Sequence, residues 1–240
     1  MSQLNSILGA FFIIAFIVLL VASNVRWAFN SLPLYELGFS RHSVVDATGL
    51  AQGQLSEVAR QIRDYFNSSE ELLDVLVNIN GTKKALYSER EVLHMQDVKE
   101  LISRIYRMQE GVFLYLLLFT TVGFFILGNA FAGRLGRLLT QGSLLIMVLA
   151  ALVGLVSLAR FGPLFLLFHR LSFSNDLWQL DPYTSYLLQM FPQGFWLDAM
   201  LLVGLATIVE AVAVLVLLAV LKWFRAWRQR VAQSKAPRFI

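Results

Sequence analysis

The sequence has 240 residues, of which 57% are hydrophobic and only 15% are charged, with a formal net charge of +4. Soluble domains usually carry about 25% charged residues, so this composition excludes an ordinary soluble domain and favours a chain surrounded largely by lipid. The sequence contains no cysteine, which excludes disulfides, thiolate nucleophiles and cysteine-based metal sites.

Four apolar stretches predict four transmembrane helices, at residues 1–24, 111–131, 143–168 and 197–221. About 20 apolar residues in a helix cross the hydrocarbon core of a bilayer. The first stretch ends in Val21-Ala22-Ser23, which resembles a signal-peptide cleavage site. No Lys or Arg precedes it, so we expect an uncleaved helix instead. The predicted fold class is an all-α membrane protein with four transmembrane helices and an extracellular, mostly helical cap.

The short basic segments set the predicted orientation. Residues 132–142 form a predicted loop with two arginines, and the tail at residues 222–240 holds six Lys and Arg and no acidic residue. Both are predicted to be cytoplasmic by the positive-inside rule. The cap (residues 25–110) and an interfacial segment (residues 169–196) then lie outside. We interpret the tail as an anchor on anionic lipid, not as a nucleic-acid-binding segment.

The cap is predicted to contain one amphipathic helix and one hairpin. The helix follows from apolar residues at helical spacing. They are Leu55, Val58, Ile62, Tyr65 and Phe66. The turn signal Asn80-Gly81 predicts a short hairpin between residues 73–79 and 85–87.

Local signals also predict where later helices begin and bend. Ser88 and Glu91 have the spacing of a capping box, which predicts a helix over residues 88–109. Gly111 is expected to permit a bend into the second transmembrane helix. Gly162-Pro163 is expected to kink or end the third one.

His94 is the first candidate for chemistry. Asp97 follows it by three residues, so both side chains emerge on one face of the predicted helix. A carboxylate that accepts from one imidazole nitrogen would fix the tautomer and leave the other nitrogen as a base. The alternative interpretation is a solvated His–Asp pair on the cap surface.

His169 is the second candidate, because it begins a polar run at the end of an apolar stretch. The run includes Arg170, Asn175 and Asp176. Polar groups that border a membrane region are costly and are functional by default. The alternative is an interfacial belt in which aromatic residues such as Trp178 and Trp196 anchor the helices at headgroup depth.

The third histidine, His42, has no distinctive context, and we expect it to be a surface residue. No His-x-x-x-His or His-Glu-x-x-His pattern exists in the sequence. Two histidines and carboxylates from distant segments remain as an alternative metal site. We predict that the protein uses no metal and no other cofactor.

Two segments resemble a known bacterial family, the lipoprotein intramolecular transacylases. They are Ser-Glu-Arg-Glu-Val-Leu-His-Met-Gln-Asp-Val-Lys at residues 88–99 and the run from Phe168-His169 to Asp181-Pro182. The order of one span, a large cap and three further spans is also similar over nearly the whole chain. The resemblance implies two catalytic histidines where the cap meets the bacterial plasma membrane, and they match His94 and His169.

The resemblance also implies a reaction. The sn-2 acyl chain of a diacylglyceryl-modified lipoprotein would move to the α-amino group of its N-terminal cysteine, which gives the lyso-form lipoprotein. We expect Asp97, Asn175 and Asp176 to support the histidines, and His94 to be the base because Asp97 could orient it. Further residues are expected to contact the lipid and lipoprotein substrate. These are Met95, Phe168, Arg170, Phe173, Trp178, Phe191 and Trp196.

Two other functions fit the same sequence. The protein could be a non-catalytic membrane scaffold or chaperone whose cap binds other proteins. It could also be a metal-dependent hydrolase of membrane lipids. No nucleic-acid partner is expected.

Overall fold

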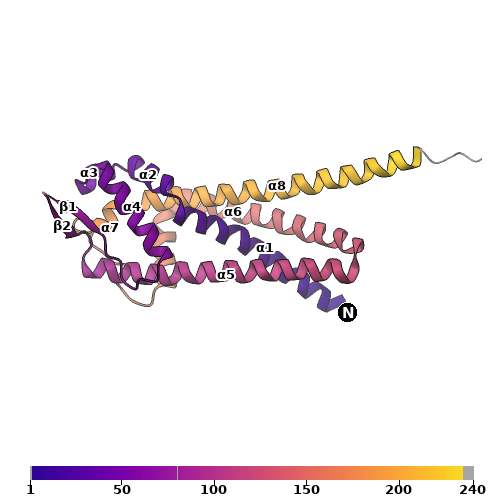
Figure 1. The fold of residues 1–240 in the computed structure, drawn as a ribbon, viewed down its shortest axis with the longest axis horizontal. Helices are drawn as coiled ribbons and strands as arrows, with labels where there is room; N and C mark the ends of the chain where they lie inside the picture. The colour runs from indigo at the N-terminus through magenta and orange to yellow at the C-terminus, as the bar shows by residue number, and fades with distance from the viewer. Residues whose placement is uncertain (1, 80, 235–240) are drawn as a thin grey trace, which may run out of the picture. The chain divides into compact units, whose positions relative to one another are not determined.

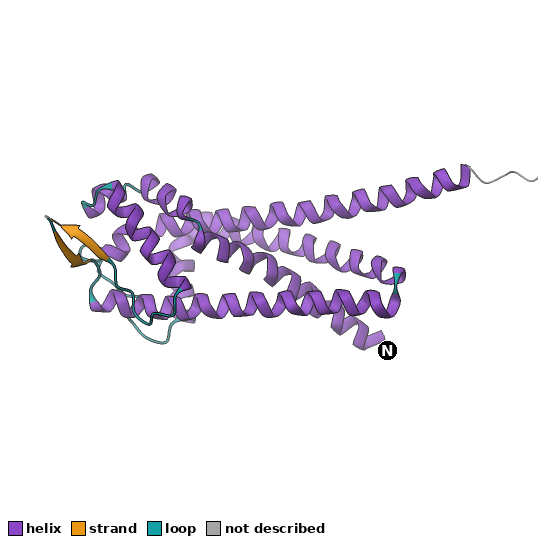
Figure 2. Ribbon diagram, viewed as in Figure 1, coloured by secondary structure: helices purple, strands orange, loops and turns teal. Residues whose placement is uncertain are grey.

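The computed structural model describes residues 2–79 and 81–234, and it is almost entirely helical (Figure 2). Asn80 of the predicted turn, together with Lys235 and Arg238 of the basic tail, lies outside the described residues. The elements in chain order are α1 (Ser2–Asn30), α2 (Leu32–Arg41), α3 (Val44–Thr48), α4 (Gln52–Asn67), β1 (Leu76–Ile79), β2 (Thr82–Ala85), α5 (Glu89–Leu127), α6 (Asn129–Ser172), α7 (Tyr186–Met190) and α8 (Gln193–Ser234) (Figure 1).

Among the described residues, four helices are long and apolar enough to cross a membrane: α1, α5, α6 and α8. Their apolar parts leave large side chains uncovered by protein, such as Phe125 at 91% exposure and Leu155 at 65%. Such side chains are costly in water and suit contact with lipid. The predicted all-α membrane fold with four spanning helices is confirmed.

Two predictions about helix ends are wrong. Helix α5 passes through Gly111 without a break and continues to Leu127, so the glycine does not bend the chain. Residues 132–142, which we predicted as a loop, belong to α6, and the two helices join at Gly128, whose φ is +53°. The arginines in this segment lower its hydropathy, but arginine is a good helix former, so the helix continues.

The predicted kink in α6 is present, three residues before the proline. Arg160 has non-helical backbone angles (φ −148°, ψ 43°), while Pro163 lies inside the helix. Proline cannot donate a helical hydrogen bond, and its ring crowds the carbonyl one turn earlier, so the distortion falls in the preceding turn. Residues 222–234 of the basic tail extend α8 as helix.

The chain forms two compact units. The span unit comprises residues 2–20, 112–150 and 205–234, and the histidine unit comprises residues 21–111 and 151–204. The span unit has a small core of tightly packed side chains in which Phe12 and Phe16 are at most 7% exposed. The histidine unit holds all three histidines and the larger apolar core.

The core of the histidine unit forms as the sequence predicted. Leu55, Val58 and Ile62 of α4 are buried, and so are the two aromatic residues of the predicted stripe. The antiparallel hairpin is also present, with Leu76 opposite Ala85. Its second strand is the exposed segment Thr82–Ala85, which the apolar pattern did not mark.

Candidate active site

Two histidines from distant parts of the chain meet in the histidine unit. His94 lies in the second turn of α5, and His169 lies in the last turn of α6. Their ring centroids are 6.1 Å apart, and the residues are only 7% and 8% exposed. Imidazole is seldom buried without a reason, so this pair is the main candidate for chemistry.

The His169 ring is oriented by its own helix. Its Nδ1 lies 2.8 Å from the carbonyl oxygen of Phe165, one turn earlier. A carbonyl oxygen only accepts hydrogen bonds, so Nδ1 carries the proton and Nε2 of the neutral ring keeps its lone pair. The Phe165 ring also packs on the imidazole, with centroids 4.3 Å apart. Sequence reasoning missed Phe165, although its spacing of four residues from His169 is the relevant signal.

His94 lacks the partner that the sequence led us to expect. Its Nδ1 is buried and has no hydrogen-bond partner among the residues that the structure describes. Asp97 instead accepts a hydrogen bond of 2.9 Å from the side chain of Asn175. Asp97 and Asn175 therefore join α5 to the segment after α6, and Asp97 does not orient the His94 ring through a hydrogen bond.

Burial keeps His94 uncharged. Residues 89–110 of α5 contain nine charged side chains, so this part of the helix lies outside the apolar membrane-spanning segment. Burial, and secondly the nearby His169, lower the pKa of His94 from 6.5 to about 4, while Asp97 opposes the shift. Desolvation acts in this direction because it disfavours the charged imidazolium. His94 is therefore neutral at pH 7.

Aromatic rings surround the histidine pair. Phe173 contacts both imidazoles, at centroid distances of 5.2 Å from His94 and 5.6 Å from His169. Trp178 lies 5.2 Å from His169, and Phe168 lies 5.3 Å from it while remaining 48% exposed. These three residues were predicted from the sequence to contact substrate. They give the histidines an apolar setting from which water is largely excluded.

Other predicted contact residues lie elsewhere. Phe191 and Trp196 pack in the apolar core, where Phe191 contacts Tyr35 and Phe39 and is 7% exposed. Met95 belongs to the same core and is 5% exposed. The spacing of aromatic residues in the sequence could not separate core side chains from those beside the histidines.

The two predicted charged residues near His169 are both exposed. Arg170 follows His169 at the end of α6. Asp176 accepts a hydrogen bond from Gln179 through its carboxylate (2.7 Å) and one from Arg90 through its backbone carbonyl. These contacts hold the segment after α6 in place. Within residues 2–79 and 81–234, no three His, Asp or Glu side chains gather as a metal ion would require.

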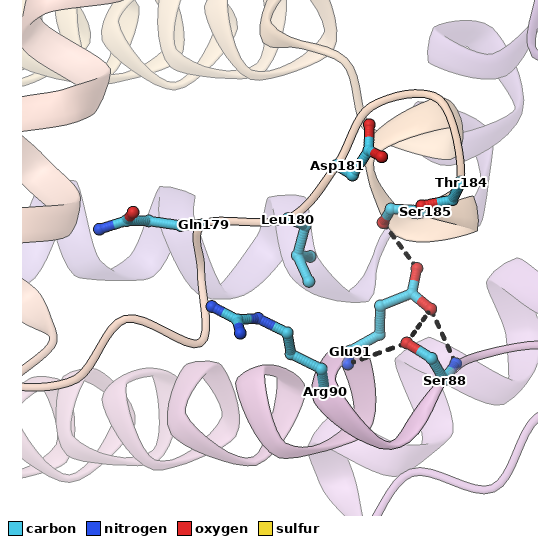
Figure 3. A pocket seen from close by; sticks show the side chains of 8 residues that line it. All are labelled: Ser88, Arg90, Glu91, Gln179, Leu180, Asp181, Thr184 and Ser185. Atoms are coloured by element: carbon cyan, nitrogen blue, oxygen red, sulfur yellow. Dashed lines mark hydrogen bonds between the residues drawn. The ribbon is translucent and has the colours of Figure 1, made fainter.

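Glu91 is a buried carboxylate that sequence reasoning recognised only in part. Its Oε2 accepts from the backbone N–H and the hydroxyl of Ser88, both at 2.7 Å, which confirms the capping box. Its Oε1 accepts from the hydroxyl of Ser185 at 2.6 Å and the N–H of Leu187 at 2.8 Å. Glu91 therefore joins the first turn of α5 to Ser185 before α7 (Figure 3). In the sequence it precedes His94 by three residues.

His42 is not an isolated surface residue, and this prediction is wrong. Its Nε2 lies 3.0 Å from Oδ2 of Asp198, which Arg41 also contacts at 3.2 Å. The imidazole packs against Gly194, where a Cβ would come within 2.5 Å of Cε1. The partner of His42 is 156 positions away in the sequence, so local spacing could not reveal it.

The family comparison bears directly on this histidine pair. The model of the family described as lipoprotein intramolecular transacylase Lit matches residues 10–196, which include both histidines. The chain belongs to this family. The resemblance seen in the sequence is therefore confirmed.

Solved structures of a transacylase from this family have the same fold. The membrane-integral lipoprotein intramolecular transacylase Lit of Bacillus cereus is 17% identical, with a TM-score of 0.74 over 96% of this chain and all of that one. A variant of it with one histidine replaced by arginine is 16% identical, with a TM-score of 0.75 over 95% of this chain and 96% of that one. At such low identity the likeness establishes the fold alone.

A curated relative of this transacylase-family chain is an uncharacterized protein of Aquifex aeolicus. The two are 26% identical over 132 residues, which cover 55% of this chain and 56% of the relative. The chain thus spans about half the length of the curated relative it matches.

Proposed function

We propose that this protein is a lipoprotein intramolecular transacylase that uses His94 and His169 for acid–base catalysis. It moves the sn-2 acyl chain of a diacylated lipoprotein from glycerol to the α-amino group of the N-terminal cysteine. The observation that carries the proposal is the convergence of two buried imidazoles, 6.1 Å apart, in a chain of this family.

The reaction needs one proton acceptor and one proton donor. An α-amine has a pKa of about 7.7–8.0, so much of it is protonated at neutral pH and must lose a proton before it attacks. Attack on the ester carbonyl forms the amide C–N bond and breaks the ester C–O bond. The proton leaves the nitrogen, and the departing glycerol oxygen gains one, so atoms and charge balance. Each well-placed acid or base typically contributes about 10²–10⁴-fold.

The geometry favours His169 as the base, contrary to our expectation from the sequence. Its Nδ1–H is held by the Phe165 carbonyl, which leaves the lone pair of Nε2 available. His94 has a pKa of about 4 and is a weaker base, but once protonated it is a strong acid. We therefore assign His94 to relay the proton that His169 takes from the amine: neutral His94 accepts it as an imidazolium and donates a proton to the departing glycerol oxygen.

The protein also has to exclude water and hold one flexible substrate in attack geometry. Correct placement of two groups in the same molecule can supply about 7–11 kcal/mol. Phe173 touches both histidines, and its ring keeps the reacting ester away from water that would hydrolyse it. Phe168, which is half-exposed beside His169, is placed to contact an acyl chain.

We further propose that the cap of the histidine unit lies on the outer face of the bacterial plasma membrane. The basic residues near the α5–α6 joint and in the last part of α8 favour a cytoplasmic position for those ends. The diacylated lipoproteins of bacteria are anchored by their lipid in the outer leaflet, so this orientation brings the substrate to the histidines.

The test is tandem mass spectrometry of N-terminal lipopeptides from a host that makes diacylated lipoproteins. Expression of the protein should leave lipopeptide mass unchanged and move one acyl chain from glycerol to nitrogen. His94→Gln and His169→Gln should abolish the shift at equal protein level, while His42→Gln should retain it. Loss of one acyl mass would instead indicate a hydrolase, and an unaltered acyl position would overturn the proposal.

A further inference from the structure

A hollow lined mostly by polar residues lies at the start of α5, one turn before His94, and the proposed chemistry does not use it. It has a volume of about 400 Å³ and is lined by the first turn of α5 and by residues 179–185 (Figure 3). Glu91 forms part of its lining, but four hydrogen bonds already occupy that carboxylate. A ligand would therefore meet the other groups that line the hollow.

Those groups exclude two kinds of ligand. Leu180 is the one apolar side chain among the lining residues, and the other apolar surface belongs to carbon atoms of polar side chains, so the hollow has no continuous apolar wall for an acyl chain. Arg90 is its one cation, and Asp181 contributes a carboxylate to the same lining, so an isolated anion such as a phosphate would meet repulsion as well as attraction. The hollow is built for a ligand with mixed polarity and little net charge.

The remaining lining groups match a peptide main chain. Thr184 offers a hydroxyl that both donates and accepts, whereas the Ser88 hydroxyl already donates to Glu91 and can only accept from a ligand. Gln179 offers its amide oxygen and one N–H, because its Nε2 also donates to Asp176. A peptide presents alternating N–H donors and carbonyl acceptors along its length. The lining residues come from two segments that Glu91 holds together, so their spacing is fixed before a ligand arrives.

The position of the hollow identifies which peptide it could receive. Glu91 precedes His94 by three residues, a rise of about 4.5 Å along a helix. On the other segment, Gln179 directly follows Trp178, whose ring packs on His169. An extended chain advances about 3.3 Å per residue, so two or three residues attached to a reacting cysteine would reach the hollow.

We propose that this hollow binds the main chain of the two or three residues that follow the acylated cysteine of the substrate. The proposal rests on the proposed function, because it takes the histidine pair as the place where the cysteine amine reacts. Binding there would hold the α-amino group of the cysteine near His169 during transfer. The hollow thus recognises any lipidated peptide through its backbone, whatever its side chains.

A competition experiment tests this. Two synthetic substrates are mixed in the same detergent micelles with the full-length protein: a diacylglyceryl-cysteine with four further residues, and a diacylglyceryl-cysteine amide without them. Their relative conversion, followed by mass spectrometry, gives the ratio of the two kcat/KM values. We expect the longer substrate to be favoured about tenfold, the effect of one or two net hydrogen bonds.

Thr184→Trp, which fills the hollow from its exposed side, should reduce the ratio to near one, and Gln179→Ala should reduce it about threefold. Tyr183→Trp is the matched control, because Tyr183 is 90% exposed and does not line the hollow, and it should keep the ratio. An unchanged ratio in both hollow variants would overturn the inference. So would equal use of the two substrates by the unmodified protein, whereas failure to convert either substrate would overturn the proposed function itself.

Discussion

The histidine unit contains two histidine sites of contrasting construction. His42 is paired directly with the carboxylate of Asp198, which it shares with Arg41. The buried Nδ1 of His94 has no partner within residues 2–79 and 81–234, and the neighbouring carboxylate of Asp97 bonds Asn175 instead. The His94 ring lies next to the imidazole of His169. A carboxylate partner fixes the orientation of a histidine ring, whereas burial beside another imidazole keeps His94 neutral. The contrast makes His42 the control for the proposed catalytic roles of His94 and His169.

The largest effect should come from removing either buried imidazole. We expect His169→Gln and His94→Gln each to slow acyl transfer by about 10²–10⁴-fold, because each removes one proton-transfer group. The rate is measured with purified protein and a diacylated lipopeptide. His42→Gln is the control and should cost less than about threefold. An equal loss at all three positions would remove the distinction between the two sites.

The next largest effect should come from Glu91→Gln. An amide cannot accept all four hydrogen bonds, so the part-buried N–H of Ser88 or the buried N–H of Leu187 would face another donor. Such a loss typically costs about 1–3 kcal/mol of unfolding free energy. We expect a lower thermal midpoint and a rate reduced about tenfold.

Glu89→Gln is the matched control for this variant. It makes the same change in the first turn of α5 at an exposed position. Its effect on the free energy of unfolding should stay within about 0.5 kcal/mol. If Glu89→Gln and Glu91→Gln changed the free energy of unfolding equally, the contacts of Glu91 with the start of α7 would not contribute to stability.

A smaller effect is expected at the His42 site. In Gly194→Ala the new methyl group would lie 2.5 Å from Cε1 and 2.9 Å from Nδ1 of His42, so the ring must move away from Asp198. Overpacking of this kind costs about 1–3 kcal/mol. Thermal unfolding should show the loss, while the transfer rate per folded molecule stays near its original value.

Gly204→Ala, in the same helix, is the control for that change. Among the described residues, no atom outside the adjoining backbone of α8 lies within 4 Å of its Cβ position, so the substitution should be neutral or slightly stabilising. A transfer rate that fell in Gly194→Ala in proportion to stability would show that the His42 pair also supports catalysis.

The smallest effect is the response of His94 to mild acid. With a pKa of about 4, His94 should be less than about one-tenth protonated at pH 5. The folded pKa lies below the ordinary value of 6.5, so this group stabilises the fold above pH 6.5, and its contribution declines as the pH falls from 6.5 towards 4. Nitrogen chemical shifts of labelled histidine, assigned with His94→Gln, would measure the titration. A midpoint near 6.5 would contradict the buried, neutral ring.

Sequence reasoning predicted what depends on local composition. Hydropathy predicted the four spanning helices. The capping box predicted the start of α5 and the contacts of Glu91 with Ser88. It failed where charge was taken as a sign of a loop, since the arginines of residues 132–142 lie in a helix. Hydropathy reports the preference of a segment for lipid, which is a different property from its preference for helix.

Within the candidate site, the sequence predicted the two histidines but not their partners. The spacing of His94 and Asp97 indicated a hydrogen bond, yet Asp97 bonds Asn175, which is 78 positions away. Similarly, Ser185 completes the contacts of Glu91 from 94 positions away. Such partners depend on how α6 and the segment after it pack on α5, and spacing along one helix contains no information about that packing.

The hydrogen bond between His169 and the carbonyl oxygen of Phe165 affects which substitutions the site can tolerate. The acceptor is a main-chain oxygen, so Phe165→Ala would keep it, whereas one substitution at Asp198 deletes the partner of His42. The tautomer of His169 depends only on the last turns of α6 being helical. The distortion at Arg160 lies before those turns. The carbonyl oxygen of residue 165 therefore keeps its position as long as these turns are helical, whatever side chain replaces phenylalanine.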